Sequence, residues 1–401
     1  MKQVSTLLKS KPFFRRKRQP QNMALYDHSF YGHFVPLTFV KGMVINMNNR
    51  LERVMKALKK AGLSQMLVTD PHSIRYLTGV DIEPGERFLG LLLSEKAPKL
   101  IINRLFSTSV KDYEIVWYSD TDDLAGKISQ LCDGERTLGV DKQMPARFLL
   151  PLRDRLPHSR MTLASECVDW VRGVKDETER ELMRMNSRIN DEVMLRTKAF
   201  ICEGMTEKQV AEYLTAQYYD LGCESVSFDP IVSFGANAAD PHHMPDNTVL
   251  RRGDCIVVDI GGKKQGYCSD MTRTFACKEA SEELRRVHEL VVRANETAES
   301  VIKPGMRLCD IDKAARDVIT DAGYGEYFTH RLGHFIGTEV HEYGDASAAF
   351  TKEVEEGMIF SCEPGVYLLG NLGVRIEDLV LVTRDGCEVL NRVEKKLEIV
   401  G

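Results

Sequence analysis

The hydrophobic positions of the chain first follow a helical period just after Asn48. The segment LERVMKALKKAG places four apolar side chains on one helical face, and Gly62 ends the pattern. Four short apolar runs come next, QMLVT, FLGLLL, KLIIN and IVWY. Short apolar runs with helices between them are typical of an α/β arrangement. We therefore predict an α/β domain over residues 48–172 and expect no catalytic cluster within it.

A second domain is predicted over residues 173–401. The segment VRGVKDETERELMRMNSRINDEVMLR indicates a boundary followed by a long helix, and Asp176 and Glu179 have the spacing of a capping pair at its start. Residues 1–47, in contrast, include the basic stretch KSKPFFRRKRQPQN, which has neither a helical nor a strand period. We predict a disordered tail there, with a nucleic-acid or membrane contact as the alternative.

The second domain contains an internal repeat. Two helical segments open with Gly-Met and close on a helix-ending glycine, at residues 204–222 and 305–323. Two apolar strands follow, GDCIVVDIG from Gly253 and GMIFSCEPG from Gly357, and each carries an acid six residues after its first glycine. A second β-rich stretch with an acid then follows in each case, GYCSDMTRT or GVRIEDLVL. Such self-similarity predicts two half-domains of one plan.

Four acids occupy equivalent positions in these halves: Asp259, Asp270, Glu363 and Glu377. Duplicated halves usually pack about a pseudo-two-fold axis, so we expect the four carboxylates to converge. Converging carboxylates are costly to bury unless a cation neutralises them. Carboxylates with imidazole suit Mn²⁺, Fe²⁺, Co²⁺ or Zn²⁺. With one histidine the acids supply five ligands, which favours two ions, about 3.5–4 Å apart, over a single ion.

A histidine-rich segment supplies the candidates for the fifth ligand. HRLGHFIGTEVHE carries three of the ten histidines, His330, His334 and His341. The first two have the i, i+4 spacing of a helical zinc site. Gly333 and Gly337 disfavour a helix, however, so a strand or loop is the better prediction. One histidine should bind metal while the others face substrate, and the spacing alone does not say which.

Composition narrows the remaining classes of function. The net charge of −5 disfavours a nucleic-acid binder, and no apolar run approaches the roughly 20 residues of a membrane helix.

Ten scattered cysteines without a CxxC pair indicate reduced thiols and a cytoplasmic protein. Cys362 neighbours Glu363 but alternates to the opposite strand face, so we expect a buried core thiol. The sequence has no GxSxG elbow, P-loop or GxGxxG motif.

From Asn48 to its end, the chain resembles the creatinase/prolidase branch of the pita-bread metallopeptidases, such as Xaa-Pro aminopeptidase and Xaa-Pro dipeptidase. The resemblance is carried by NAADPHHMP, VVDIGGKKQGYCSDMTRTF, HRLGHFIGTEVHE, EPGVY and GVRIEDLVLVT, with DPHSIRYLTGV in the first domain. It implies an α+β fold class. A pita-bread catalytic domain with an internal pseudo-two-fold repeat would follow an α/β creatinase-type N-terminal domain.

The resemblance also implies how the five ligands divide between two ions. Asp259 would chelate one ion, Asp270 and Glu377 would bridge both, and His334 and Glu363 would hold the other. Glu363 would serve in addition as the proton acceptor. Mn²⁺ is the favoured metal, with Co²⁺, Zn²⁺ or Fe²⁺ as alternatives.

Further residues receive roles from the same resemblance. Three histidines would line the substrate side and stabilise the tetrahedral intermediate: His242, His330 and His341. Tyr367 and Arg375 would form a relay behind the metal carboxylates, and His243 would either support a neighbouring site residue or be structural. Two departures from the family pattern, Arg331 and Phe335, are expected to reshape the pocket.

The implied activity is hydrolysis of Xaa-Pro bonds, at the N-terminus of peptides or in dipeptides, by a hydroxide that bridges the two metal ions. The expected partner is a short peptide with proline in second position, and the expected assembly is a homodimer, without nucleic acid or membrane. One alternative is a metal-dependent hydrolase of a small non-peptide amide on the same fold. Another is a non-catalytic binding relic, which would carry little metal.

Overall fold

The structure is a computed structural model that describes residues 47–108, 110 and 113–401. The predicted basic tail, except for its last residue, lies outside the described residues. All ten cysteines fall within the described part, and all are free. No helix in these described ranges has both the length and the apolar character needed to cross a membrane.

The first domain is built on a mixed six-stranded sheet with the strand order β4-β3-β2-β1-β5-β6. The four predicted apolar runs form its first four strands, β1 (Gln65–Val68), β2 (Gly90–Ser94), β3 (Lys99–Asn103) and β4 (Glu114–Tyr118). Sequence analysis missed the two remaining strands, β5 (Leu138–Val140) and β6 (Met161–Leu163). These are only three residues long, so they offer too few positions for a period to emerge.

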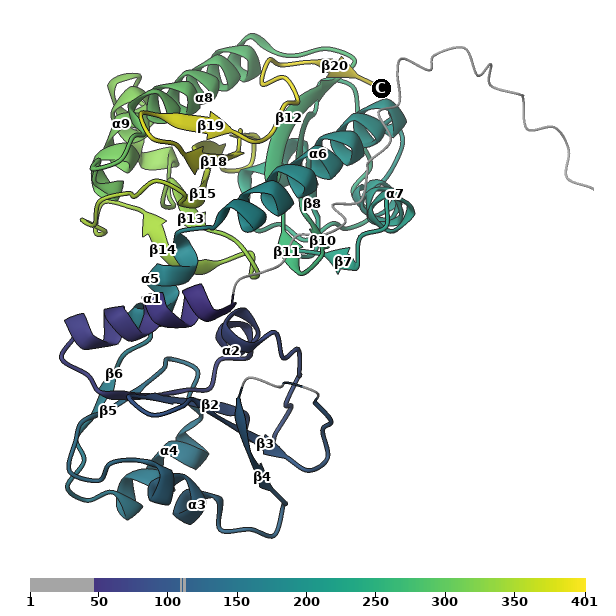
Figure 1. Cartoon of the computed structure of the whole chain (residues 1–401). Coiled ribbons are helices and arrows are strands. Elements are labelled where there is room, and N and C mark those ends of the chain that lie inside the picture. The colour runs from purple at the N-terminus through teal and green to yellow at the C-terminus, as the bar shows by residue number, and fades with distance from the viewer. Residues whose placement is uncertain (1–46, 109, 111–112) are drawn as a thin grey trace, which may run out of the picture. The chain divides into compact units, whose positions relative to one another are not determined.

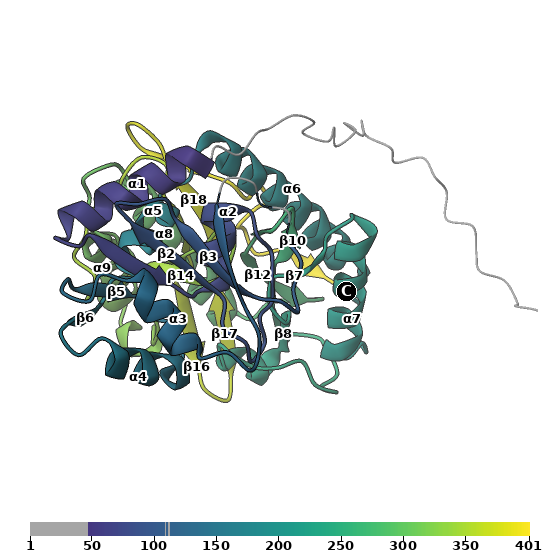
Figure 2. The ribbon, with the colours of Figure 1, turned by 60° about the horizontal axis from the view of Figure 1, so that its bottom comes forward.

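Helices cover both faces of this sheet, as Figures 1 and 2 show. One face packs against α1 (Met47–Lys60), α2 (Pro71–Thr78) and α5 (Glu166–Gly173), and the other against α3 (Leu124–Leu131) and α4 (Ala146–Arg155). The predicted apolar face of α1 is confirmed, because Val54 and Leu58 are fully buried. The domain therefore has the predicted α/β architecture.

The second domain opens with α6 (Glu177–Phe200) and α7 (Glu207–Asp220). The predicted capping pair is present, since Asp176 and Glu179 each accept a hydrogen bond from the other's backbone N–H. A sheet of order β20-β12-β9-β8 completes this half, with β8 (Ile231–Phe234), β9 (Cys255–Ile260), β12 (Met271–Cys277) and β20 (Ile399–Val400). Beside it lie the 3₁₀ helix η1 (Gly235–Ala239) and a small sheet of β7 (Ser225–Val226), β10 (Gly262–Lys264) and β11 (Tyr267–Cys268).

The other half begins with α8 (Glu282–Val301) and α9 (Leu308–Asp321), followed by the 3₁₀ helix η2 (Gly325–Tyr327). Its sheet has the order β14-β13-β15-β18-β19. The strands are β13 (Gly333–Phe335), β14 (Glu342–Ala346), β15 (Ile359–Cys362), β18 (Asp378–Val382) and β19 (Cys387–Val389). A hairpin of β16 (Gly365–Leu368) and β17 (Leu372–Arg375) stands apart from that sheet.

The two halves share one plan, as the repeat predicted. Each has two helices followed by an antiparallel sheet, in which β9 pairs with β12 in one half and β15 with β18 in the other. Glycines at matching turns adopt nearly the same left-handed backbone, with φ of 90° at Gly204 and 86° at Gly305, and of 88° at Gly253 and 91° at Gly357. Only glycine takes up this conformation at little cost. The repeated glycines therefore impose the same chain reversals on both halves.

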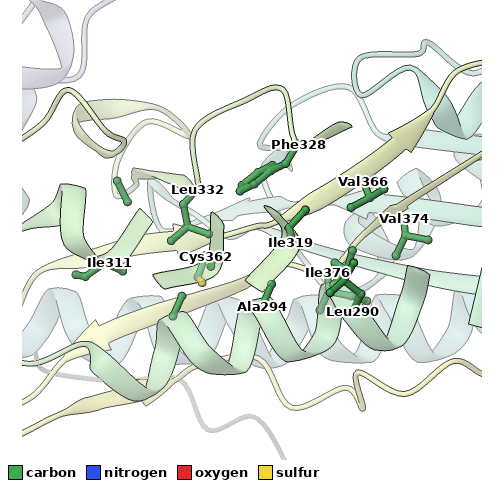
Figure 3. Packing of buried hydrophobic residues seen from close by; sticks show 14 of the residues in the cluster. Leu290, Ala294, Ile311, Ile319, Phe328, Leu332, Cys362, Val366, Val374 and Ile376 are labelled. Atoms are coloured by element: carbon green, nitrogen blue, oxygen red, sulfur yellow. The ribbon is translucent and has the colours of Figure 1, made fainter. Parts of the chain in front are cut away.

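The largest hydrophobic core lies between α8, α9 and the second sheet (Figure 3). Leu290, Ala294, Ile311 and Ile319 project into it from the two helices. Cys362 is part of the same cluster and fully buried, so the expectation of a core thiol is confirmed. Fully burying a large aliphatic side chain contributes about 1.5–3 kcal/mol. This packing anchors β15, and Glu363 directly follows the strand.

Candidate metal centre and active site

All five candidate metal ligands lie together, the four acids at strand ends of both halves and the histidine within a strand. Asp259 lies near the end of β9 and Asp270 directly precedes β12, while Glu363 directly follows β15 and Glu377 directly precedes β18. His334 is the middle residue of β13. All five line one cavity of about 600 Å³. The convergence inferred from the repeat is therefore present in the structure.

The ligand atoms approach one another without hydrogen bonding. His334 Nε2 lies 3.6 Å from Asp270 Oδ2 and 3.5 Å from Glu363 Oε1. One ligand atom each from Asp270, His334 and Glu377 can be chosen so that all lie within 4.8 Å of one another. Oxygen and imidazole donors gathered at such separations match the coordination sphere of a divalent cation.

The orientation of the His334 ring follows from its backbone. Its Nδ1 lies 3.2 Å from Phe335 O and donates to that carbonyl, so the Nε2 lone pair faces the carboxylates. Burial, and next the neighbouring His341, lower the pKa of His334 to about 3. The ring is therefore neutral, which is the state that can bind a metal.

The carboxylates are under strong mutual repulsion. Burial raises the pKa of Asp270 and of Glu377 well above the ordinary range, and neighbouring acids raise both further. The pKa of Glu363 rises to about 7, first through burial and against the opposing effect of Arg375. Asp259 Oδ1 and Asp270 Oδ1 are buried with no hydrogen-bond partner among the described residues. Buried acceptors of this kind are rarely left unsatisfied in proteins, so the residues present fit a bound cation.

Two hydroxyl side chains that sequence analysis missed support the ligands. Thr272 Oγ1 donates to Glu377 Oε2 over 2.8 Å, and Ser361 Oγ donates to Glu363 Oε1 over 3.1 Å. The signal was available, because each hydroxyl lies two residues from a candidate ligand along a strand. Side chains at i and i+2 share a strand face, so Thr272 lies on the face of Asp270 and Ser361 on that of Glu363.

The structure distinguishes the surroundings of the histidines, which spacing had left open. His330 Nδ1 lies 2.7 Å from Arg331 O, and its Nε2 lies 2.8 Å from Tyr367 Oη. Tyr367 in turn accepts a hydrogen bond from Arg375 Nη1 over 3.0 Å. Both ring nitrogens of His330 are thus engaged away from the carboxylates. In His334, by contrast, Nε2 faces the carboxylates.

The remaining histidines lie at the rim or outside the cavity. His341 packs edge-on against the His334 ring with centroids 4.1 Å apart, and the exposed His242 lines the same cavity. His243 bonds to Glu207 instead, over 2.8 Å. Glu207 and Asp246 form a second cluster of potential metal ligands with His243. Glu207 Oε2 already accepts a hydrogen bond from the Asp246 N–H, and Oε1 accepts one from the Phe234 N–H. We therefore interpret this cluster as a structural hydrogen-bond network rather than a metal site.

One sequence expectation about the cavity is wrong. Phe335 was expected to reshape the pocket, but its ring is fully buried in the core against Phe360 and Trp170. Strand alternation explains this, because neighbours of the inward-facing His334 point to the opposite face. Arg331 does line the cavity, as expected, and lies 3.5 Å from Asp345. Sequence analysis also missed several apolar lining residues: Phe228, Ile231, Met244 and Val340.

Two protein-family models match the sequence of the chain, one in each domain. Residues 50–174 match the creatinase/prolidase N-terminal domain, and residues 181–384 match metallopeptidase family M24. The chain belongs to metallopeptidase family M24. A curated member, an uncharacterized peptidase of Staphylococcus saprophyticus, is 33% identical over 352 residues, which are 86% of this chain and 100% of that protein.

Solved structures of family members share the whole two-domain fold. Dipeptidase PepE from Mycobacterium ulcerans superposes with a TM-score of 0.84 at 35% identity, over 88% of this chain and 98% of that one. The Xaa-Pro dipeptidase from Bacillus anthracis gives 0.82 at 31% identity, over 88% and 100% of the chains. A prolidase from Thermococcus sibiricus gives 0.82 at 33%, over 89% and 100%. The pita-bread fold class and the assignment as a metal-dependent peptidase are thereby confirmed.

Proposed function

We propose that the protein is a dinuclear metal-dependent peptidase that hydrolyses Xaa-Pro bonds, with dipeptides as its main substrates. The observation that carries the proposal is the convergence of four carboxylates, three of them buried and Glu363 partly exposed, with the Nε2 atom of His334 in one cavity. The choice of substrate is supported by relatives named prolidase and Xaa-Pro dipeptidase, which the chain matches over their full length.

In this proposal two divalent ions, with Mn²⁺ favoured, are held by Asp259, Asp270, His334, Glu363 and Glu377. Asp270 and Glu377 are the most deeply buried of the four acids, at 4% and 1% exposed, and would hold the ions at the inner end of the cavity. When bound, such ions lower the pKa of water toward roughly 7 and polarise a carbonyl oxygen. Arg375 and Thr272 would hold the outer oxygens of Asp259 and Glu377 in place.

Glu363 is the proposed proton acceptor. Its side chain is 17% exposed, compared with 5% for Asp270, so it is the more accessible of the two from the cavity. Ser361 fixes one carboxylate oxygen, which leaves the other free to take a proton from the attacking water and pass it to the leaving nitrogen. In an Xaa-Pro bond that nitrogen belongs to the proline ring.

Three histidines are proposed to line the substrate side of the cavity. His242 and His341 reach the cavity from its exposed rim, where they can donate to a substrate oxygen. His330 lies beside them with its Nε2 held by Tyr367. Apolar side chains of the cavity, among them Phe228, Ile231 and Val340, suit a proline ring.

Metal exchange combined with a substrate series tests the proposal. The protein is stripped with a chelator, its metal content is measured, and Mn²⁺, Co²⁺ or Zn²⁺ is restored singly. Each form is assayed on Xaa-Pro dipeptides, Xaa-Pro-Xaa tripeptides and Xaa-Ala dipeptides. We expect two ions per chain, no turnover without metal and highest kcat/KM on Xaa-Pro dipeptides with Mn²⁺. Two bound ions without turnover of any peptide would refute the proposal and favour a small non-peptide amide as substrate; negligible metal content would indicate a binding relic.

Assembly and compartment stay predictions. A homodimer is proposed from the family, and light scattering coupled to size exclusion would show a mass near twice the 45.4 kDa of the chain. A cytoplasmic location is supported by the ten free thiols, because unpaired cysteines are typical of reducing compartments. A monomer at micromolar concentration would contradict the first prediction.

A further inference from the structure

Arg172 is a buried cation that joins the first domain to the active-site wall. It lies in the last turn of α5, and its side chain is only 3% exposed. Its Nη2 atom donates to three acceptors in the second domain, each over 2.8 Å: Thr338 Oγ1, Glu339 Oε2 and Glu342 Oε1. All three belong to one short stretch, residues 337–342, which we call the 337–342 segment.

The 337–342 segment delivers two side chains to the cavity, Val340 and His341. The His341 ring packs on the proposed ligand His334. The described elements flanking the segment are β13, three residues long, and β14, which begins at Glu342. Within the segment, Gly337 makes two backbone hydrogen bonds, donating to Glu339 O and accepting from Cys268 N. Side-chain contacts add to these, among them the hydrogen bond that Glu342 Oε1 accepts from the Thr338 N–H over 2.9 Å.

The other end of Arg172 is anchored by the DPHSIRYLTGV motif, to which the proposed chemistry assigns no role. Arg172 Nη1 lies 3.2 Å from both Asp70 Oδ2 and Ser73 Oγ. Asp70 is also the N-cap of α2, where it accepts the backbone N–H groups of His72 and Ser73. The guanidinium thus connects a helix start of the first domain to the segment that carries His341.

We propose that Arg172 is a positioning residue that fixes His341 at the cavity and so makes catalysis depend on the N-terminal domain. The inference rests on the proposed peptidase function. Without the guanidinium, Glu342 would keep only Lys175, at 3.1 Å, and the partly exposed Glu339 would keep only His72, at 3.8 Å, as ion-pair partners. Removing one partner from a buried ion-pair network is destabilising, so the segment would rearrange and His341 would leave its place.

Arg50 provides a matched control. Its side chain is also 3% exposed, and it too forms ion pairs with the second domain, at 3.2 Å to the buried Glu179 and at 3.1 Å to the partly exposed Asp176. Those partners lie at the start of α6 and not in the 337–342 segment. Arg50→Met should therefore reproduce the loss of a buried interdomain ion pair without disturbing His341.

The test compares R172M with R50M in the full, metal-loaded protein. Hydrogen exchange of the 337–342 segment should accelerate in R172M and stay at the wild-type rate in R50M. On an Xaa-Pro dipeptide, R172M should lower kcat roughly ten- to a hundredfold, since displacement of a catalytic group by about 1 Å costs that much. Metal content should remain at the wild-type level in both variants.

A double-mutant cycle separates positioning from general destabilisation. If Arg172 acts through His341, adding R172M to H341A should cause no further loss of kcat/KM, whereas R50M and H341A should add. Equal exchange of the segment in R172M and R50M, or additive effects of R172M and H341A, would overturn the inference. T338V, which removes one acceptor of Arg172, replaces R172M if that variant does not fold. If the wild type turns over no peptide, the proposed function fails and hydrogen exchange alone decides this inference.

Discussion

Arg375 Nη2 donates to Asp259 Oδ2 over 2.6 Å, so the chain itself partly neutralises one of the four converging acids. The same guanidinium reaches Thr272 Oγ1 and Tyr367 Oη, which ties it to both halves of the repeat. Burial raises the pKa of each of the other three acids, Asp270, Glu363 and Glu377. Buried acids that repel one another in this way favour the binding of a cation in the cavity.

Glu363→Gln should abolish turnover almost completely while the fold is retained. The amide keeps the size of the side chain and can still accept from Ser361, but it cannot take up a proton. Loss of a general base typically costs about 10²–10⁴-fold in rate. The measurement is kcat on an Xaa-Pro dipeptide at saturating Mn²⁺, with circular dichroism to verify folding.

Glu356→Gln is the matched control for that substitution. Glu356 lies just before β15, is 51% exposed and contacts only Arg180 at 3.8 Å among its ion-pair partners in the described chain. Its kcat should equal that of the wild type. Full activity in the Glu363 variant would remove this residue from the proton transfer.

Thr272→Val should weaken metal binding without unfolding the protein. The hydroxyl donates to Glu377 and accepts from Arg375 Nε over 3.1 Å, so its loss frees both groups to move. Removing a partner that orients a metal ligand typically costs 10–100-fold in metal affinity. Titration calorimetry of the stripped protein with Mn²⁺ measures the change directly.

Thr274 offers the comparison for Thr272. It lies two residues further along β12, is equally buried, and its hydroxyl donates to the main-chain oxygen of Arg375 rather than to a ligand. Thr274→Val should leave the metal affinity near the wild-type value. Equal losses in both variants would mean that buried hydroxyls on this strand affect affinity only through general packing.

His288 should make the folded state sensitive to acid. It is buried in α8, and burial lowers its pKa from 6.5 to about 4, against a hydrogen bond to the backbone of Thr274. The unfolded chain binds the proton more readily, so this contribution to stability is complete above pH 6.5 and is lost as the pH falls through 4. A pKa shift of this size corresponds to a change of about 3 kcal/mol in the free energy of unfolding between pH 6.5 and pH 4.

His288→Asn keeps a side-chain donor and cannot titrate. The difference in unfolding free energy between wild type and variant should therefore shrink as the pH is lowered from 7 to 4, as urea unfolding at a series of pH values would show. His158→Asn, a change at an exposed histidine, is the surface control measured alongside. A constant difference for His288 across that range would contradict the prediction.

Sequence alone determined the framework of the site. The offsets of Asp259 and Glu363 from their glycines, and the repeated left-handed turns at Gly253 and Gly357, are properties of short segments. Local backbone geometry and strand alternation depend on only a few neighbouring residues, so they can be inferred from a single sequence. The apolar face of α1 and the first four strands of the first domain could be predicted for the same reason.

Only the tertiary structure decided which partner each side chain meets. His330 and His334 are indistinguishable by spacing, yet Tyr367, 37 residues away, engages the first and leaves the second facing the carboxylates. Arg172 reaches Glu342 across 170 positions, and Phe335 turned out to be core rather than pocket. Contacts between residues far apart in the chain are set by how whole elements pack, and no local period records that packing.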